Sequence, residues 1–355
     1  MDAGESLAQR TLELVNIPSV SREEAAIADY VRAAIGVSDP ELVYDADNCL
    51  CYLAPEQSAP VVFLAGHLDT VPAQGNLPGR RDAARVYGLG ASDMKGGVAV
   101  MIELARWFVQ ERPRLPVGLG LLFFGREELP VEESPLPAFF DAFDFRAELV
   151  IVLEPTDNEI HAGCLGNIEA RLRFHGESAH SARPWTGTNA IDLAVRGLAK
   201  LVGREPRPVE IDGLKFYEVL SVTGISGGIA PNVIPAEAEA VLNFRYSPTR
   251  TPGEAEAALR ELVDDAGELA ILSNSPAGRV ELAAPLVQEL RRAGSFAVAP
   301  KQAWTPVAQF SERGHNAVNL GPGATRYAHR RDEQVEIAEL VRTYDALQRF
   351  LTGTV

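Results

Sequence analysis

Side chains that can bind metal ions or transfer protons follow three short apolar runs of this sequence. Each run ends in a histidine or in acidic residues: 61–65 before His67 and Asp69, 119–124 before Glu127 and Glu128, and 149–153 before Glu154. If the runs are parallel strands of one open sheet, their carboxyl ends share an edge, where functional groups commonly gather. The sequence therefore predicts that an imidazole and several carboxylates meet at one edge of a sheet.

A glycine-rich segment, 88–97, lies between the first two runs and contains Asp93. Its spacing is superficially that of a dinucleotide-binding loop, but Asp93 occupies the position of the last glycine, and a turn-rich stretch precedes it instead of a clear strand. We therefore expect Asp93 to point into the acidic cleft. A late candidate, His329, follows a second glycine-containing stretch, 321–323.

Carboxylates that lie close together cannot all stay ionised without a cation, because like charges raise their pKa values. A pair of divalent ions that share a bridging carboxylate would balance this charge with nitrogen and oxygen ligands. Taken singly, each acidic residue is more often a helix cap or a solvated loop residue, and each histidine is more often structural. The repeated pattern is what favours a metal site.

The elements between these residues predict an α/β fold. The apolar runs are continuous, as strands buried on both faces are, and helices are expected at 5–15, 23–35 and 95–110. Ser21 and Glu24 have the spacing of a capping box for the second helix. We expect a mixed, mostly parallel sheet with helices on its faces.

From residue 167 onward the pattern changes to alternating apolar and polar residues, which is typical of antiparallel strands with one exposed face. Strands and helices follow in the order β-α-β-β-α-β up to residue 275. We predict a catalytic domain formed by 1–166 and 276–355, with an inserted α+β domain at 167–275.

Composition narrows the class of protein. Lys and Arg number 33 against 49 Asp and Glu, and the net charge of −16 argues against a binder of nucleic acid. The three cysteines, Cys49, Cys51 and Cys164, form no disulfide or zinc-knuckle pattern. No signal peptide or membrane-spanning run is evident, so a cytoplasmic protein without a membrane partner is expected.

Taken together, the motifs resemble a known family, the co-catalytic metallopeptidases that include aminoacylases, acetylornithine deacetylase and carboxypeptidases. The matching stretches occur in family order: GHLDTVP (66–72), GASDMKGG (90–97), the pair at 127–128, LEPT (153–156) and His329. Other stretches look most similar to succinyl-diaminopimelate desuccinylases: AHSARPW (179–185), GGIAPNVIP (227–235), NFRY (243–246) and VNLGPG (318–323).

The resemblance implies a role for each matching metal ligand. Asp93 would bridge two ions, most often zinc, with cobalt or manganese as alternatives. His67 and Glu154 would complete the first ion's ligands, and Glu128 and His329 the second's. Glu127 would be the general base that takes a proton from the water between the ions.

Further roles are implied around the ions. Asp69 would orient the imidazole of His67, and His180 would stabilise the oxyanion, often across a homodimer. The other candidates would contact a small anionic N-acyl amino acid substrate: Asn232, Arg245, Arg183 and Gly323.

The implied reaction is removal of succinate from N-succinyl-L,L-2,6-diaminopimelate in lysine and diaminopimelate biosynthesis. The alternatives are an N-acyl-amino-acid deacylase, a dipeptidase or carboxypeptidase of the same family, and a metal- or ligand-binding relative without activity. Three places depart from the common family pattern and affect pocket walls rather than metal ligands: Arg126, Cys164–Leu165 and Pro306.

Overall fold

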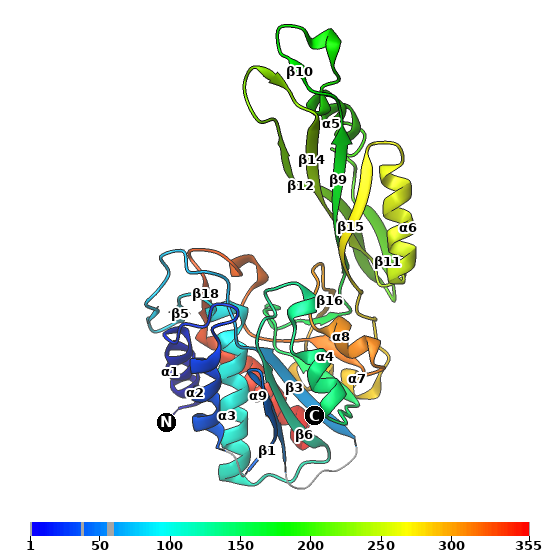
Figure 1. Cartoon of the computed structure of the whole chain (residues 1–355). Coiled ribbons are helices and arrows are strands. Elements are labelled where there is room, and N and C mark those ends of the chain that lie inside the picture. The colour runs from blue at the N-terminus through cyan, green and yellow to red at the C-terminus, as the bar shows by residue number, and fades with distance from the viewer. Residues whose placement is uncertain (1, 37–38, 55–59, 355) are drawn as a thin grey trace. The chain divides into compact units, whose positions relative to one another are not determined.

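The computed structural model describes residues 2–36, 39–54 and 60–354 (Figure 1). The chain forms two compact units. The first consists of residues 1–163, 281–299 and 309–355, and the second consists of 164–280 and 300–308. Segment 300–308 therefore packs with the second unit, whereas the sequence predicts the whole C-terminal part to belong to the first.

An eight-stranded mixed sheet forms the centre of the first unit. Its strands, in spatial order, are β1 (Glu41–Ala46), β2 (Cys49–Leu53), β6 (Gly118–Phe124), β3 (Val61–His67), β7 (Leu149–Val152), β17 (Ala317–Asn319), β8 (Ile160–Ala162) and β16 (Val298–Pro300). The central strands β6, β3, β7 and β17 are parallel to one another. This confirms the predicted fold class, and it places the carboxyl ends of β3, β6 and β7 at one edge.

Helices pack on both faces of this sheet, which explains why the strands are continuous apolar runs. On one face, Val62 and Leu64 join the core formed with α1 (Ala3–Val15), α2 (Ala25–Ile35), α3 (Gly96–Glu111), α7 (Pro285–Gly294) and α9 (Ile337–Thr352). On the other face, the ring of Phe63 contacts Phe145 at 4.4 Å between centroids. Phe145 in turn contacts rings of α4 (Leu136–Ala142) and α8 (Val307–Glu312).

A small three-stranded sheet lies beside the glycine-rich turn before α3. Its order is β18 (Gln334–Glu336), β5 (Arg85–Tyr87) and β4 (Arg80–Arg81), and β18 pairs antiparallel with β5. The sequence pattern does not predict this sheet, because its strands are only two or three residues long. It joins the segment after His329 to the segment before Asp93.

The capping box predicted at Ser21 and Glu24 is wrong. Helix α2 begins at Ala25, and no side chain caps its N-terminus. The hydroxyl of Ser21 instead donates to Asp69 at 2.7 Å, and the Glu24 carboxylate accepts the backbone N–H of Arg22 at 2.8 Å. Both side chains therefore form hydrogen bonds with loop residues instead of capping the helix.

The second unit contains a five-stranded antiparallel sheet with two helices. The strand order is β11 (Arg207–Ile211), β12 (Leu214–Gly227), β14 (Glu237–Tyr246), β9 (Gly166–His175) and β15 (Glu268–Ser275). Apolar residues of β9 and β14 form a core with α5 (Ala190–Leu198) and α6 (Pro252–Val263). Two short strands, β10 (Ala179–His180) and β13 (Val233–Ile234), pair outside this sheet.

Candidate metal centre

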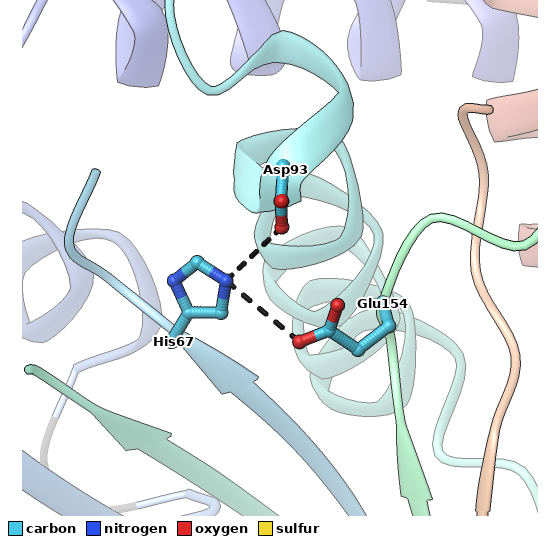
Figure 2. A group of neighbouring side chains, drawn as sticks. All are labelled: His67, Asp93 and Glu154. Carbon is cyan, nitrogen blue, oxygen red and sulfur yellow. Dashed lines mark hydrogen bonds and ion pairs between the residues drawn. The ribbon is translucent and has the colours of Figure 1, made fainter. Parts of the chain in front are cut away.

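His67 is the last residue of β3, and its side chain is fully buried. Its Nδ1 lies 3.0 Å from the backbone oxygen of Asp69. Its Nε2 lies 3.2 Å from Oδ1 of Asp93 and 3.8 Å from Oε1 of Glu154, so the ring points between two carboxylates (Figure 2). When Nδ1–H donates to the backbone oxygen, the lone pair on Nε2 faces both carboxylates and is available to a cation.

Asp93 lies between two histidines. It sits in the turn 91–95, immediately before α3. Oδ1 faces His67, and Oδ2 lies 3.5 Å from Nε2 of His329. The same nitrogen of His329 lies 2.9 Å from Oε1 of Glu128. One carboxylate therefore has a separate oxygen directed at each imidazole, which is the geometry a bridging ligand requires.

In the described part of the chain, three overlapping groups of side chains have potential ligand atoms within 4.8 Å of one another: His67, Asp93 and Glu154; Asp93, Glu128 and His329; and His67, Glu127 and Glu128. The first two groups share Asp93 and are the two ligand sets implied by the family resemblance. The structure thus brings together all five predicted ligands and Glu127. This set of nitrogen and oxygen donors fits two divalent ions in neighbouring positions.

The charges of the cluster perturb each other strongly. Burial raises the pKa of Glu127, and the nearby carboxylates of Glu154 and Glu128 raise it further. Burial works against protonation of His67, but hydrogen bonds with Asp69 and Asp93 raise its pKa above the usual value. Without ions, the acids are thus balanced partly by protonated imidazoles. Divalent cations would replace those protons.

Asp69 lies beneath the cluster and is fully buried. One carboxylate oxygen accepts the backbone N–H of Glu127 at 3.0 Å, and the other accepts that of Glu128 at 3.1 Å. Its Oδ1 is 3.5 Å from Nδ1 of His67, farther than its own backbone oxygen. Both of its carboxylate oxygens therefore hold the loop with the two glutamates, a role that the sequence did not suggest.

Sequence reasoning missed two other buried acidic residues. Glu24, which is 1% exposed, accepts the backbone N–H of Arg126 at 3.1 Å, directly before the glutamate pair. Glu333, which is 2% exposed, accepts backbone N–H groups of the turn that carries Asp93. The only motif that includes Glu24 is the capping box that the structure does not form, and Glu333 has no motif, so contacts between distant segments identify both roles.

In the second unit, the β10–β13 ladder brings two predicted site residues together. His180 is opposite Val233, and the backbone N–H of Ser181 donates to the oxygen of Asn232 at 3.0 Å. His180, Asn232 and Arg183 are all exposed. The Nδ1 atom of His180 accepts the backbone N–H of Ala182 at 3.0 Å, which leaves its Nε2 free to act as a donor.

Arg245 lies on β14 and is partly buried. Its Nε donates to Oδ1 of Asn243 at 2.9 Å, and Asn243 donates to Asn167 at 2.8 Å. Burial lowers the pKa of the guanidinium. Within the described part of the chain Arg245 forms no ion pair, so it is a cation positioned by amides rather than neutralised by an acid.

Gly323 is held by contacts within the first unit. Its N–H donates to Glu339 at 2.8 Å, and its oxygen accepts from the N–H of Asp157 at 2.8 Å. Its φ is +84°, and an added Cβ would lie 2.4 Å from Oγ of Ser92. These contacts give Gly323 a close packing role, and its contact with substrate stays a prediction.

The three departures from the family pattern fall into two places. Arg126 forms an ion pair with Asp47 in the first unit. The other two lie together in the second unit, where Sγ of Cys164 contacts the backbone oxygen of Thr305 at 3.6 Å and the N–H of Leu165 donates to Ala303 at 2.9 Å. Pro306 is buried beside this cluster.

Comparison with known proteins agrees with this arrangement. Residues 63–353 match peptidase family M20/M25/M40. The chain belongs to this family. A Mycobacterium tuberculosis protein provisionally named succinyl-diaminopimelate desuccinylase DapE is 37% identical over 348 residues, which cover 97% of each chain. The succinyl-diaminopimelate desuccinylase of Corynebacterium glutamicum is 33% identical and covers 96% of this chain and 95% of its own.

Solved structures of the family share the fold. The metallo-carboxypeptidase Sso-CP2 from Sulfolobus solfataricus aligns over 99% of both chains with a TM-score of 0.79 and 18% identity. The dinuclear metal-binding peptidase YXEP of Bacillus subtilis aligns over 99% of this chain and 98% of its own, with a TM-score of 0.70 and 14% identity. Among the described residues of this chain, none forms a helix with the length and apolar character that a membrane span requires.

Proposed function

We propose that this chain is a metal-dependent amide hydrolase that releases succinate from N-succinyl-L,L-2,6-diaminopimelate, in lysine and diaminopimelate biosynthesis. The observation that carries the hydrolase assignment is the position of Asp93, with one oxygen directed at His67 and the other at His329. The substrate assignment is supported by the two desuccinylase relatives, which match along nearly the whole chain.

Two ions would be held by the two ligand groups that share Asp93. His67 and Glu154 would complete one site, and Glu128 and His329 the other. We propose zinc, since imidazole and carboxylate ligands suit it, and cobalt or manganese would also fit. When bound, such ions polarise an amide carbonyl and lower the pKa of water, so that a nucleophile is available at neutral pH.

Glu127 would move the proton. Its carboxylate lies within the cluster but belongs to neither of the two groups that share Asp93. A general base works best when its pKa is near the working pH, and burial together with neighbouring acids raises the pKa of Glu127 in that direction. It would accept a proton from the attacking water and deliver it to the leaving nitrogen, while Asp69 holds its backbone in place.

Residues of the second unit would recognise the substrate. His180 and Asn232, which the β10–β13 ladder holds close together, would donate hydrogen bonds to the oxyanion. Arg245 would bind a substrate carboxylate, because a planar guanidinium matches the two oxygens of that group. Arg183, whose N–H donates to the His180 backbone oxygen at 2.8 Å, would stand beside the same substrate.

A homodimer is also proposed, with contacts through the second unit. Helix α5 exposes apolar side chains, with Ile191 38% and Val195 60% accessible, and β12 exposes Ile225 at 60%. Residues 219–227 of β12 pair with β14 along one edge of the strand. Along the other edge, β11 pairs only with residues 214–218 among the described strands. The open strand edge and the apolar helix face would suit a second copy of the chain.

A substrate panel tests the proposed reaction. Purified protein loaded with zinc is assayed with N-succinyl-diaminopimelate, N-acetylornithine and dipeptides. We expect the first to be cleaved with the highest kcat/KM. Absence of its cleavage, together with rapid cleavage of another compound, would overturn the proposed substrate.

A second candidate, an N-acyl-amino-acid deacylase or a carboxypeptidase, is favoured by two observations. Two of the departures from the family pattern, at Cys164–Leu165 and at Pro306, lie in one buried cluster. A fungal relative, 26% identical over 97% of this chain, is named a probable carboxypeptidase in Emericella nidulans. The same substrate panel separates the two candidates.

A further inference from the structure

A single buried carboxylate, that of Glu333, accepts hydrogen bonds from the backbone of the turn that carries Asp93. Oε2 of Glu333 accepts the N–H of Gly90 at 2.8 Å, and Oε1 accepts the N–H groups of Ser92 at 3.1 Å and of Asp93 at 2.9 Å. Glu333 is 240 residues from Asp93 in the sequence. Three donors from one short segment thus converge on one side chain.

Glu333 is itself held on both sides. Its backbone oxygen accepts the N–H of Gly88 at 3.0 Å, and its own N–H donates to Arg330 at 3.3 Å. The next residues form β18, which pairs with β5 from Gln334 to Glu336. His329 lies four positions before Glu333. The same segment therefore joins the turn of Asp93 to the loop of His329.

The turn depends on this acceptor for its conformation. Asp93 has φ −120° and ψ 93°, which is not helical, and Gly90 has φ +78°. The N–H groups of such a turn have no partners in a regular helix or sheet, and a buried N–H without an acceptor destabilises the conformation that contains it. A carboxylate has two acceptor oxygens, each of which can accept more than one hydrogen bond, so Glu333 can accept all three donors at once.

The alternative roles for Glu333 fit less well. Both oxygens are engaged by backbone donors, and Glu333 is in none of the three groups of potential ligand atoms in the described chain. All three hydrogen bonds reach the turn that carries the proposed bridging ligand, so Glu333 fixes the position of that turn as well as satisfying its donors. The contacts are concentrated at the position where two ligand sets meet.

We propose that Glu333 is a positioning residue for the metal centre, which holds the turn 90–93 so that the two oxygens of Asp93 stay directed at His67 and at His329. The inference rests on the proposed two-ion site. In this role Glu333 keeps Asp93 in the position from which it can bind both ions. Glu333 itself contacts neither ion.

The test measures metal binding rather than activity alone. Cobalt is titrated into metal-free protein, with calorimetry and visible spectra as readouts, for the wild type, Glu333→Gln and the control Asp332→Asn. Asp332 is an exposed neighbour whose carboxylate pairs with Arg330. We expect Glu333→Gln to bind the ions about 10- to 100-fold more weakly, as is typical for groups that orient metal ligands, with an altered cobalt spectrum. Asp332→Asn should behave as wild type.

A double-mutant cycle separates positioning from a general loss of stability. If Glu333 acts through Asp93, adding Glu333→Gln to Asp93→Asn weakens metal binding much less than adding it to the wild type. Additive losses, or wild-type affinity and spectrum for Glu333→Gln, would overturn the inference. Should Glu333→Gln fail to fold, Glu333→Asp, which keeps the charge but shortens its reach, replaces it with the same expectations. A wild type that binds fewer than two ions would instead contradict the proposed function.

Discussion

The carboxylate of Asp69 accepts the backbone N–H of Glu127 at 3.0 Å, although the two residues are 58 positions apart in the sequence. The same carboxylate accepts the N–H of Glu128. One group below the sheet edge thus sets the positions of a proposed metal ligand and of the proposed general base. A displacement of the Asp69 carboxylate would therefore affect proton transfer as well as metal binding.

Replacing Asp69 tests this link. Asp69→Asn exchanges one acceptor oxygen for an amide donor, so the N–H of Glu127 or Glu128 loses its partner. We expect kcat to fall about 10- to 100-fold while at least one ion remains bound. Ser21→Ala, which removes only the 2.7 Å hydrogen bond from the hydroxyl, serves as the milder control. Unchanged kcat in Asp69→Asn would contradict the positioning role.

Replacing Glu127 tests the general base. Glu127→Gln keeps the size of the side chain but cannot accept the proton, so kcat should fall about 10²- to 10⁴-fold with metal content unchanged. Glu132→Gln, an exposed neighbour outside the cluster, should retain full activity. Metal analysis by mass spectrometry and steady-state kinetics give the answer. Activity near the wild-type level in Glu127→Gln would exclude this base.

Proton release should accompany metal binding. Hydrogen bonds with Asp93 and Glu128 raise the pKa of His329 to about 10, and the pKa of His67 is also raised. His329 is therefore protonated at neutral pH in metal-free protein, and the raised pKa of His67 favours its protonated form, whereas a metal ligand must be neutral. Affinity should fall as pH falls, by about tenfold per pH unit for each proton released. Calorimetry in buffers of different ionisation enthalpy counts the protons, and a count of zero would contradict this charge state.

The metal-free protein should lose stability as pH rises. Because the folded pKa of His329 lies above its ordinary value of 6.5, the contribution of the protonated imidazole is complete below that pH and disappears as pH approaches 10. The melting temperature of chelated protein should therefore decrease over this interval. Zinc-loaded protein, in which the imidazoles are already neutral, serves as the control. Parallel melting curves of the two forms would argue against the predicted coupling.

Arg245 should determine affinity for a substrate carboxylate. Arg245→Lys keeps the charge but loses the planar pair of donors, so KM for the succinylated substrate should rise about 10-fold or more with a smaller change in kcat. Arg173→Gln, an exposed position on the neighbouring strand β9, should leave KM unchanged. A change in kcat alone would place Arg245 outside the substrate site.

The proposed dimer has its own test in solution. Val195→Glu places a charge on the exposed apolar face of α5 and should yield monomers in light scattering. Arg260→Glu, an exposed change on α6, should preserve the oligomeric state. If the wild type is already monomeric at working concentrations, the dimer proposal is wrong.

The sequence alone determined the fold class and the residues of the candidate centre, because both depend on short-range patterns. Strands β3, β6 and β7 are buried on both faces and so are continuous apolar runs, and their ends carry His67, the pair at 127–128 and Glu154. Asp93 stands out because an acid interrupts a glycine-rich turn.

Only the tertiary structure decided which acidic residues hold those side chains in place. Ser21 and Glu24 had the spacing of a local capping box, yet Ser21 donates to Asp69, and Glu24 accepts the N–H of distant Arg126 as well as that of Arg22. Glu333 has no motif, and its role depends on backbone N–H groups 240 residues away. A hydrogen bond between remote segments leaves no periodic signal, because its two ends come together only after the chain has folded.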